Sequence, residues 1–226
     1  MTLKHLPKRL PLLLLATALT VPSLLAQAPA GAPRPGGAPP PPPPPTAGAH
    51  LEVLPDGSSA SYAVNEQLVG IGFPNDAIGT TTALTGTLVI AADGTIPAGS
   101  SKLTADLGKL KSDQDQRDGY VRTRTLETDK FPTAEFVPTK IEGVPQMIPF
   151  QGQVGVQVTG NLTIHGVTKP VVFRGIATFG RDGVIAGRIK TDFTFATFGL
   201  TKPTLARLMT VDDKIALDLV FRLKRN

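Results

Sequence analysis

The chain has 226 residues, with 23 Lys and Arg against 18 Asp and Glu, and it contains neither cysteine nor tryptophan. The absence of cysteine excludes disulfides, thiol catalysis, thiolate metal sites and iron–sulfur clusters, so a folded domain must be held together by its own core. No cluster of Lys and Arg interleaved with aromatic residues is present, and we expect no nucleic-acid partner.

Residues 1–28 have the order of a secretory signal peptide. Three basic residues precede an apolar run at residues 10–25, which Ala26-Gln27-Ala28 follows, so we expect cleavage after Ala28 and a periplasmic or secreted protein. An uncleaved membrane anchor is the alternative, although the run is shorter than the roughly 20 apolar residues that a spanning helix needs. Cleavage leaves 20 basic and 18 acidic residues, a net charge of +2.

Residues 29–49 consist almost entirely of Pro, Gly and Ala, with an unbroken proline run at residues 39–45. Such a segment cannot bury a core, and we expect an extended, disordered linker. It serves either as a spacer or as a ligand for an SH3-like partner. The folded domain is then expected at residues 50–226.

Inside that domain, alternation of apolar and polar side chains predicts strands. In chain order, the alternating runs lie at residues 84–90, 103–107, 154–164, 189–196 and 215–222. Turn signals containing glycine separate the runs, and helices do not alternate with them. This pattern indicates an all-β fold, an antiparallel sandwich or barrel.

One polar stretch interrupts the strands. Asp113 and Asp115 would favour the positive end of a helix, so we expect a short helix at residues 113–125 that ends before Phe131-Pro132. Gly119 weakens this prediction, and an ordered loop is the alternative.

The two-residue period identifies the side chains that share a face, but not whether that face is packed or encloses a cavity. Phenylalanines gather in the C-terminal half, at positions 173, 179, 193, 195, 198 and 221. Small residues recur in the strands, at Gly86, Gly155, Gly160, Gly175 and Ala177, where they leave room or allow sharp coiling. A packed core and a ligand cavity stay open as equal alternatives.

Several blocks, in order, resemble the signature of the YceI-like family. They are Arg117-Asp118, residues 126–136 (LETDKFPTAEF), residues 158–173 (VTGNLTIHGVTKPVVF), Phe198-Gly199 and residues 211–219 (VDDKIALDL). The His165-Gly-Val-Thr-Lys-Pro170 block is the most specific of them, and the resemblance covers nearly all of residues 58–224.

The resemblance implies an eight-stranded antiparallel barrel, lipocalin-like in use, with a helix near one mouth. It also implies an exported protein whose ligands are polyisoprenoids or other long amphiphiles. Many family members begin the barrel with a His-Ser pair, whereas the corresponding residues 59–66 (SASYAVNE) contain no histidine. This departure suggests a different headgroup or ligand.

Two groups of residues are candidates for ligand contact. Phe173, Phe179, Phe193 and Phe195 are expected to line the barrel interior, unless strand parity turns some of them outward. Arg117, Asp118 and His165 are expected at the mouth, near a polar or anionic headgroup. Alternatively, the charged pair belongs to a solvated helix face, and His165 hydrogen-bonds the turn that follows it.

These observations favour a carrier of a hydrophobic small molecule. An enzyme acting on a bound isoprenoid, or a structural protein with a filled barrel, are the rival interpretations. No nucleophile elbow, phosphate loop, dinucleotide fingerprint or metal-ligand spacing is present, so we expect no catalytic residue, metal or cofactor. Transient contact with a membrane and a homodimer remain open.

Overall fold

The computed structural model describes residues 46–226 except residues 71 and 205–207. The predicted signal peptide and most of the predicted linker therefore lie outside the described residues. Residues 46–49, which we assigned to the linker, belong to the sheet structure, in the short strand β1 (Thr46–Ala47) and at the beginning of β2 (Ala49–Val53).

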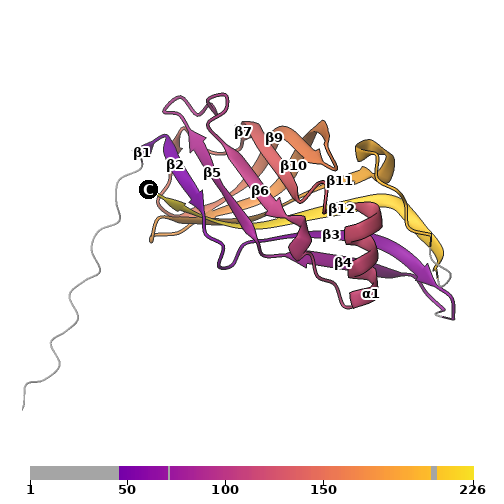
Figure 1. The fold of residues 1–226 in the computed structure, drawn as a ribbon. Helices are drawn as coiled ribbons and strands as arrows, with labels where there is room; N and C mark the ends of the chain where they lie inside the picture. Colours follow the sequence, from indigo (N-terminus) through magenta and orange to yellow (C-terminus); the bar gives the residue numbers. More distant parts are fainter. Residues whose placement is uncertain (1–45, 71, 205–207) are drawn as a thin grey trace, which may run out of the picture. The chain divides into compact units, whose positions relative to one another are not determined.

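Antiparallel strands make up most of the described chain (Figure 1). In the first half these are β3 (Ser59–Leu68), β4 (Asn75–Thr81), β5 (Leu84–Ile90) and β6 (Lys102–Asp106). In the second half they are β7 (Thr133–Glu142), β8 (Met147–Ile148), β9 (Gly152–Ile164), β10 (Val167–Phe179), β11 (Val184–Thr194) and β12 (Leu208–Arg225). The strands expected in the alternating runs are all present.

Eight strands close into a barrel, as predicted. Within the described residues the hydrogen-bonded order is β2–β5–β6–β7–β9–β10–β11–β12, and β12 pairs again with β2 to complete the ring. Beyond β2, the long strand β12 continues against β3, and β3 pairs in turn with β4. Closure leaves the ring of eight strands without a free edge, whereas β4, outside the ring, pairs on one side only among the described strands.

The helix lies close to its predicted position. A six-residue α-helix, α1 (Asp115–Tyr120), continues into a π-helical turn at Val121–Thr125. It begins two residues later than expected because the Ser112 hydroxyl accepts from the Gln114 amide, while the Asp118 carboxylate accepts from the Ser112 amide. Two further turns are 3₁₀-helical, at Leu107–Lys109 and Phe195–Phe198.

The second of these turns corrects the predicted strand at residues 189–196. Strand β11 ends at Thr194, although Phe193 and Phe195 continue the apolar alternation. Thr194 and Thr197 cap the turn reciprocally through their side chains, and Gly199 ends it with a φ of 64°. Local hydrogen bonding therefore overrides the apolar period at this point.

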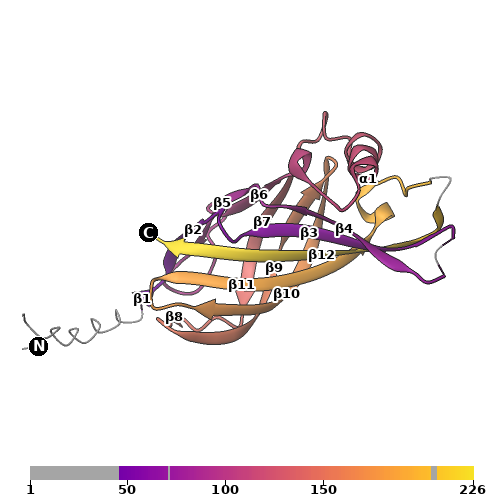
Figure 2. The same ribbon diagram turned by 90° about the horizontal axis from the view of Figure 1, so that it is seen from below.

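The two ends of the barrel differ. Figures 1 and 2 show α1 at one end, which we call the helix end, and β1, β8 and the C-terminus at the other. The interior of that other end, which we call the packed end, is filled by apolar side chains. They include Leu51, Leu88, Ile148, Val156, Phe179, Ile185 and Leu223, all less than 10% exposed.

Ser58 joins two parts of the barrel wall where β2 gives way to β3. Its side chain is buried, and its hydroxyl donates to the Leu54 carbonyl at 2.6 Å and accepts from the Arg222 amide at 2.9 Å. The hydroxyl thus replaces a ladder hydrogen bond at a point where neither strand supplies one.

We expect Ser58→Ala to lower the free energy of unfolding by about 1–3 kcal/mol, because it leaves the Arg222 amide buried without an acceptor. Urea denaturation followed by circular dichroism measures this difference. Thr139→Val is the matched control, since it removes an exposed hydroxyl that also bonds a strand carbonyl. A Ser58 variant no less stable than this control would contradict the assignment.

Candidate functional site

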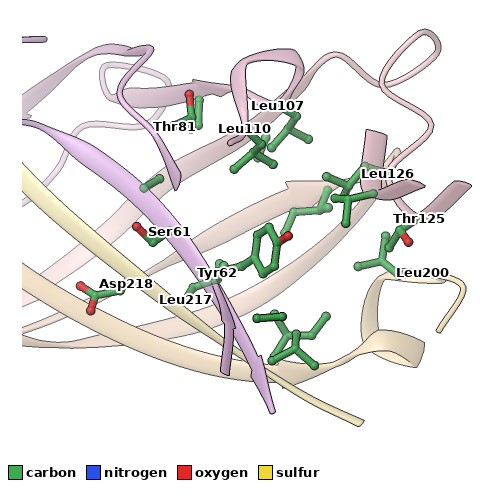
Figure 3. Close-up of a pocket in the computed structure, with 18 of the residues that line it drawn as sticks. Ser61, Tyr62, Thr81, Leu107, Leu110, Thr125, Leu126, Leu200, Leu217 and Asp218 are labelled. Carbon is green, nitrogen blue, oxygen red and sulfur yellow. The ribbon is translucent and has the colours of Figure 1, made fainter. Parts of the chain in front are cut away.

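A cavity of about 850 Å³ lies inside the helix end of the barrel. Strands β3–β7 and β9–β12 form its wall, and the segment at residues 114–126 contributes further residues, among them Thr125 and Leu126 (Figure 3). Its volume falls in the range of about 300–1,000 Å³ that small-molecule sites occupy. The alternative left open by the sequence is therefore resolved: the barrel is hollow at one end and packed at the other.

Most of the cavity wall is apolar. Its aliphatic members include Val64, Leu84, Leu107, Leu110, Leu126, Leu162, Ile164, Leu200, Ile215 and Leu217, and its phenylalanines are Phe136, Phe173, Phe193 and Phe195. Such a surface is solvated poorly by water and favours the hydrocarbon part of a ligand.

Polar side chains gather at the helix end of the cavity. Glu66 on β3 and Arg117 on α1 both line it, and Arg117 Nη2 donates to Glu66 Oε1 at 2.6 Å. Their side chains are 9% and 14% exposed, respectively. Arg117 also forms an ion pair with Asp113, four residues earlier on the chain.

The charge of Arg117 is thus already matched inside the protein. Burial lowers the pKa of the guanidinium, but the hydrogen bonds and charges of Glu66 and Asp113 outweigh burial and raise this pKa above its ordinary value. Arg117 therefore stays charged, with two carboxylates as partners before any ligand arrives.

Tyr62 brings a second polar group to the cavity. Figure 3 shows its ring projecting from β3 into the cavity. The ring lies over Gly79, its cross-strand partner, where a Cβ would approach the Tyr62 Cε1 to 2.3 Å. Burial raises the pKa of the phenol from 10.0 to about 12; Arg117 opposes the rise, and nearby carboxylates add to it. The phenol is consequently a hydrogen-bond donor at any physiological pH.

Thr125 adds a buried hydroxyl to the same wall. Its side chain is 6% exposed, and its Oγ1 has no hydrogen-bond partner among the described residues. A buried hydroxyl without a partner is uncommon in folded proteins, and a bound polar group would satisfy it.

The predicted lining residues divide between the two ends. Phe173, Phe193 and Phe195 line the cavity, and Phe193 packs edge-on against Phe198 with ring centroids 4.6 Å apart. Phe179 instead faces the packed end, where it is 4% exposed. All four side chains are buried, and Phe195 reaches the cavity from the 3₁₀ turn at Phe195–Phe198 rather than from a strand.

The predicted mouth residues also separate. Arg117 lines the cavity, whereas Asp118 does not. The Asp118 side chain is 2% exposed; its Oδ1 accepts from the Ser112 amide, and its Oδ2 lies 3.8 Å from Lys111 Nζ. Asp118 therefore anchors the start of the helix rather than facing a headgroup.

His165 also lies outside the cavity wall and joins two loops. Its Nε2 lies 2.8 Å from Glu127 Oε2, and its ring packs edge-on against Phe131 at 4.6 Å. Both His165 and Glu127 have positive φ, at 53° and 46°. Strained backbone persists where surrounding contacts hold it, so this pair fixes the end of the helical segment to the β9–β10 turn.

Sequence reasoning did not select Tyr62, Glu66 or Thr125. The first two occupy inward positions of β3, with Ala60 and Val64, on a strand whose neighbouring residues are too small and polar to show an apolar period. Glu66 could have been found from the sequence as a carboxylate at an inward position of a strand, because a buried charge requires a partner.

Neither a metal centre nor a spanning helix stands out in the part of the chain that the structure describes. No three His, Cys, Asp or Glu side chains are grouped there to hold a metal ion. Among the same residues, no helix has the length and apolar character needed to cross a membrane.

Comparison with known proteins identifies relatives of this barrel. A family model of the YceI-like domain matches residues 52–223. A UPF0312 protein of Pseudomonas putida (strain W619) is 38% identical over 87 residues, which are 37% of this chain. That match spans 41% of the length of the Pseudomonas protein.

Solved structures share the fold at low identity. A polyisoprenoid binding domain from Saccharophagus degradans, implicated in plant cell wall breakdown, superimposes with a TM-score of 0.61 at 16% identity, over 79% of this chain and 99% of that one. BcnA of Burkholderia cenocepacia gives a TM-score of 0.57 at 15% identity, over 75% of this chain and 98% of BcnA.

Tyr62 yields a prediction about pH. Because its pKa is higher in the folded protein than the ordinary value of 10.0, the neutral phenol stabilises the fold below about pH 10, and this contribution is lost as pH rises towards 12. Tyr62 and Tyr120 are the two tyrosines of the chain, so the tyrosinate absorbance of wild type minus that of Tyr62→Phe isolates Tyr62. The difference should titrate near pH 12; a midpoint at 10 would refute burial of the phenol.

Proposed function

Because this chain belongs to the YceI-like domain family, we propose that it binds a long-chain amphiphile, a polyisoprenoid of the quinone or polyprenol type, inside the helix end of its barrel. The observation that carries the proposal is the cavity of about 850 Å³, whose wall is mostly apolar and which holds the Arg117–Glu66 ion pair and the Tyr62 and Thr125 hydroxyls. The polyisoprenoid binding domain from Saccharophagus degradans, which has a similar fold, supports this class of ligand.

The hydrocarbon chain supplies most of the affinity in this proposal. Each methylene buried contributes about 0.8 kcal/mol, so ten contribute about 8 kcal/mol before the cost of ordering the chain. That free energy corresponds to micromolar binding. No strong polar contact is needed to hold the ligand, and the polar groups instead set its orientation and headgroup.

The charges beside the cavity favour a neutral headgroup. Arg117 is matched by Glu66 and Asp113, so a phosphate or carboxylate would have to displace one of these partners. The Tyr62 and Thr125 hydroxyls, in contrast, can donate to a carbonyl or hydroxyl oxygen without disturbing an ion pair. Glu66 is tied to Arg117, which also argues for binding rather than for catalysis by this carboxylate.

Export and delivery complete the proposal. We expect residues 1–28 to direct the chain to the periplasm or the exterior. Val69 lines the cavity and is 60% exposed, and Phe73 and Met209 near it are 70% and 60% exposed. These side chains are suited to transient contact with a membrane from which an insoluble ligand is loaded.

Intrinsic fluorescence tests the binding site directly, since the chain lacks tryptophan and both of its tyrosines line the cavity. A quinone with a long isoprenoid tail should quench the tyrosine emission with saturation near one per chain. The same quinone ring without its tail is the control and should quench far less. A polyprenyl phosphate should displace the quinone less effectively than the polyprenol of equal length.

The opposite order, with the polyprenyl phosphate as the stronger competitor, would contradict the preference for a neutral headgroup. Equal quenching by the quinones with and without the tail would refute the proposal that the isoprenoid tail supplies most of the affinity.

Vesicle cosedimentation tests the membrane contact. Phe73→Ser should reduce sedimentation of the protein with phosphatidylcholine vesicles, because it removes an exposed apolar side chain from the connection between β3 and β4, which also carries Val69. Ile176→Ser is the matched control: Ile176 is 47% exposed on β10 and does not line the cavity. An equal effect of both variants, or of neither, would contradict a membrane contact at this end.

A further inference from the structure

A second void lies beyond the cavity, inside the packed end. It measures about 70 Å³, and every side chain that lines it is apolar. Leu103 on β6, Phe136 on β7 and Leu219 on β12 line both spaces. These three side chains therefore form a partition, which we call the floor of the cavity.

The order of inward residues along each strand places the floor between the two spaces. On β12, Leu217 lines the cavity and Phe221 the void, with Leu219 between them. On β7, Ala134 lines the cavity and Pro138 the void, with Phe136 between them. The floor is consequently a single layer of inward residues rather than a thick plug.

On three other strands a glycine occupies the corresponding inward position, between a residue that lines the cavity and a residue that lines the void. Gly86 lies between Leu84 and Leu88, Gly160 between Leu162 and Val158, and Gly175 between Phe173 and Ala177. A Cβ on Gly160 would come within 2.6 Å of Phe136 Cζ, so this glycine makes room for the ring. The Phe136 ring also packs edge-on against Phe173, with centroids 5.0 Å apart.

We propose that the floor, and Phe136 above all, sets the longest isoprenoid chain that the cavity accepts. The inference rests on the proposed function and deepens it by assigning chain-length selection to a side chain. Below the floor the space is apolar, so a chain that passed Phe136 would meet a favourable environment. In the wild-type protein, isoprene units beyond the length that reaches the floor must remain in water and add no affinity.

Competition by a series of polyprenols that differ by one isoprene unit, against the quenching quinone, tests this inference. In wild type the affinity should rise with each unit and then level off at a limiting length. In Phe136→Ala the limit should move to longer chains. The first polyprenol beyond the wild-type limit should then bind about tenfold tighter than it binds wild type, since two additional buried methylenes suffice for this factor.

Two further variants keep the inference testable if the loss of the buried ring impairs folding. Leu219→Ala opens the same floor with a smaller change. Ala134→Phe fills the cavity above the floor without entering the packed end, and it should move the limit to shorter chains. Val156→Ala is the matched control, because Val156 lines the void but not the cavity, and its truncation leaves the floor intact.

The outcomes separate the two proposals. If wild type binds none of the polyprenols, the proposed function fails. If wild type binds them and folded Phe136→Ala or Leu219→Ala keeps the wild-type limit, the floor does not select chain length. A shift of equal size in Val156→Ala would likewise overturn the inference, because general loosening of the barrel would then explain it.

Discussion

The pairing of β11 with β12 closes the sheet on itself, and this closure decides where a ligand can be held. Once the ring is closed, every second side chain of its eight strands must share one enclosed space. Near the C-terminus large aliphatic and aromatic side chains fill that space. Near α1 the inward positions include Ala60, Ala77, Ala105 and Ala134, and the space remains open.

Glycine allows aromatic rings to lie across the inside of the wall at three heights. Tyr62 lies over Gly79 in the cavity, Phe136 over Gly160 at the floor, and Phe221 over Gly187 in the packed end. Each ring occupies the place where a Cβ would otherwise stand. Of the glycines that suggested room for a ligand in the sequence, Gly160 accommodates the protein's own Phe136 ring, whereas Gly86 and Gly175 face the backbone of a neighbouring strand. Alanines provide much of the open volume.

The alternating runs predicted the strands well because alternation follows from the strand geometry itself. Alternation could not predict which end of the barrel is hollow, because it identifies the side chains that face inward but not how much space they leave at each position along the barrel axis. Resemblance directed attention to His165 and Asp118, yet both hold backbone in place. His165 meets Glu127 from 38 residues away, and no spacing in the chain predicts such a contact. Arg117 was predicted at the mouth, but its ion pair with Glu66, 51 residues away in the chain, was not.

In the proposed function, the helix end of the barrel holds a long-chain amphiphile in the cell. Native mass spectrometry of the mature protein, isolated from the cells that naturally produce it and followed by solvent extraction, detects such a ligand. We expect one neutral polyisoprenoid for each chain. Protein that is repeatedly isolated empty, and that also takes up no quinone or polyprenol when these are supplied, would contradict it.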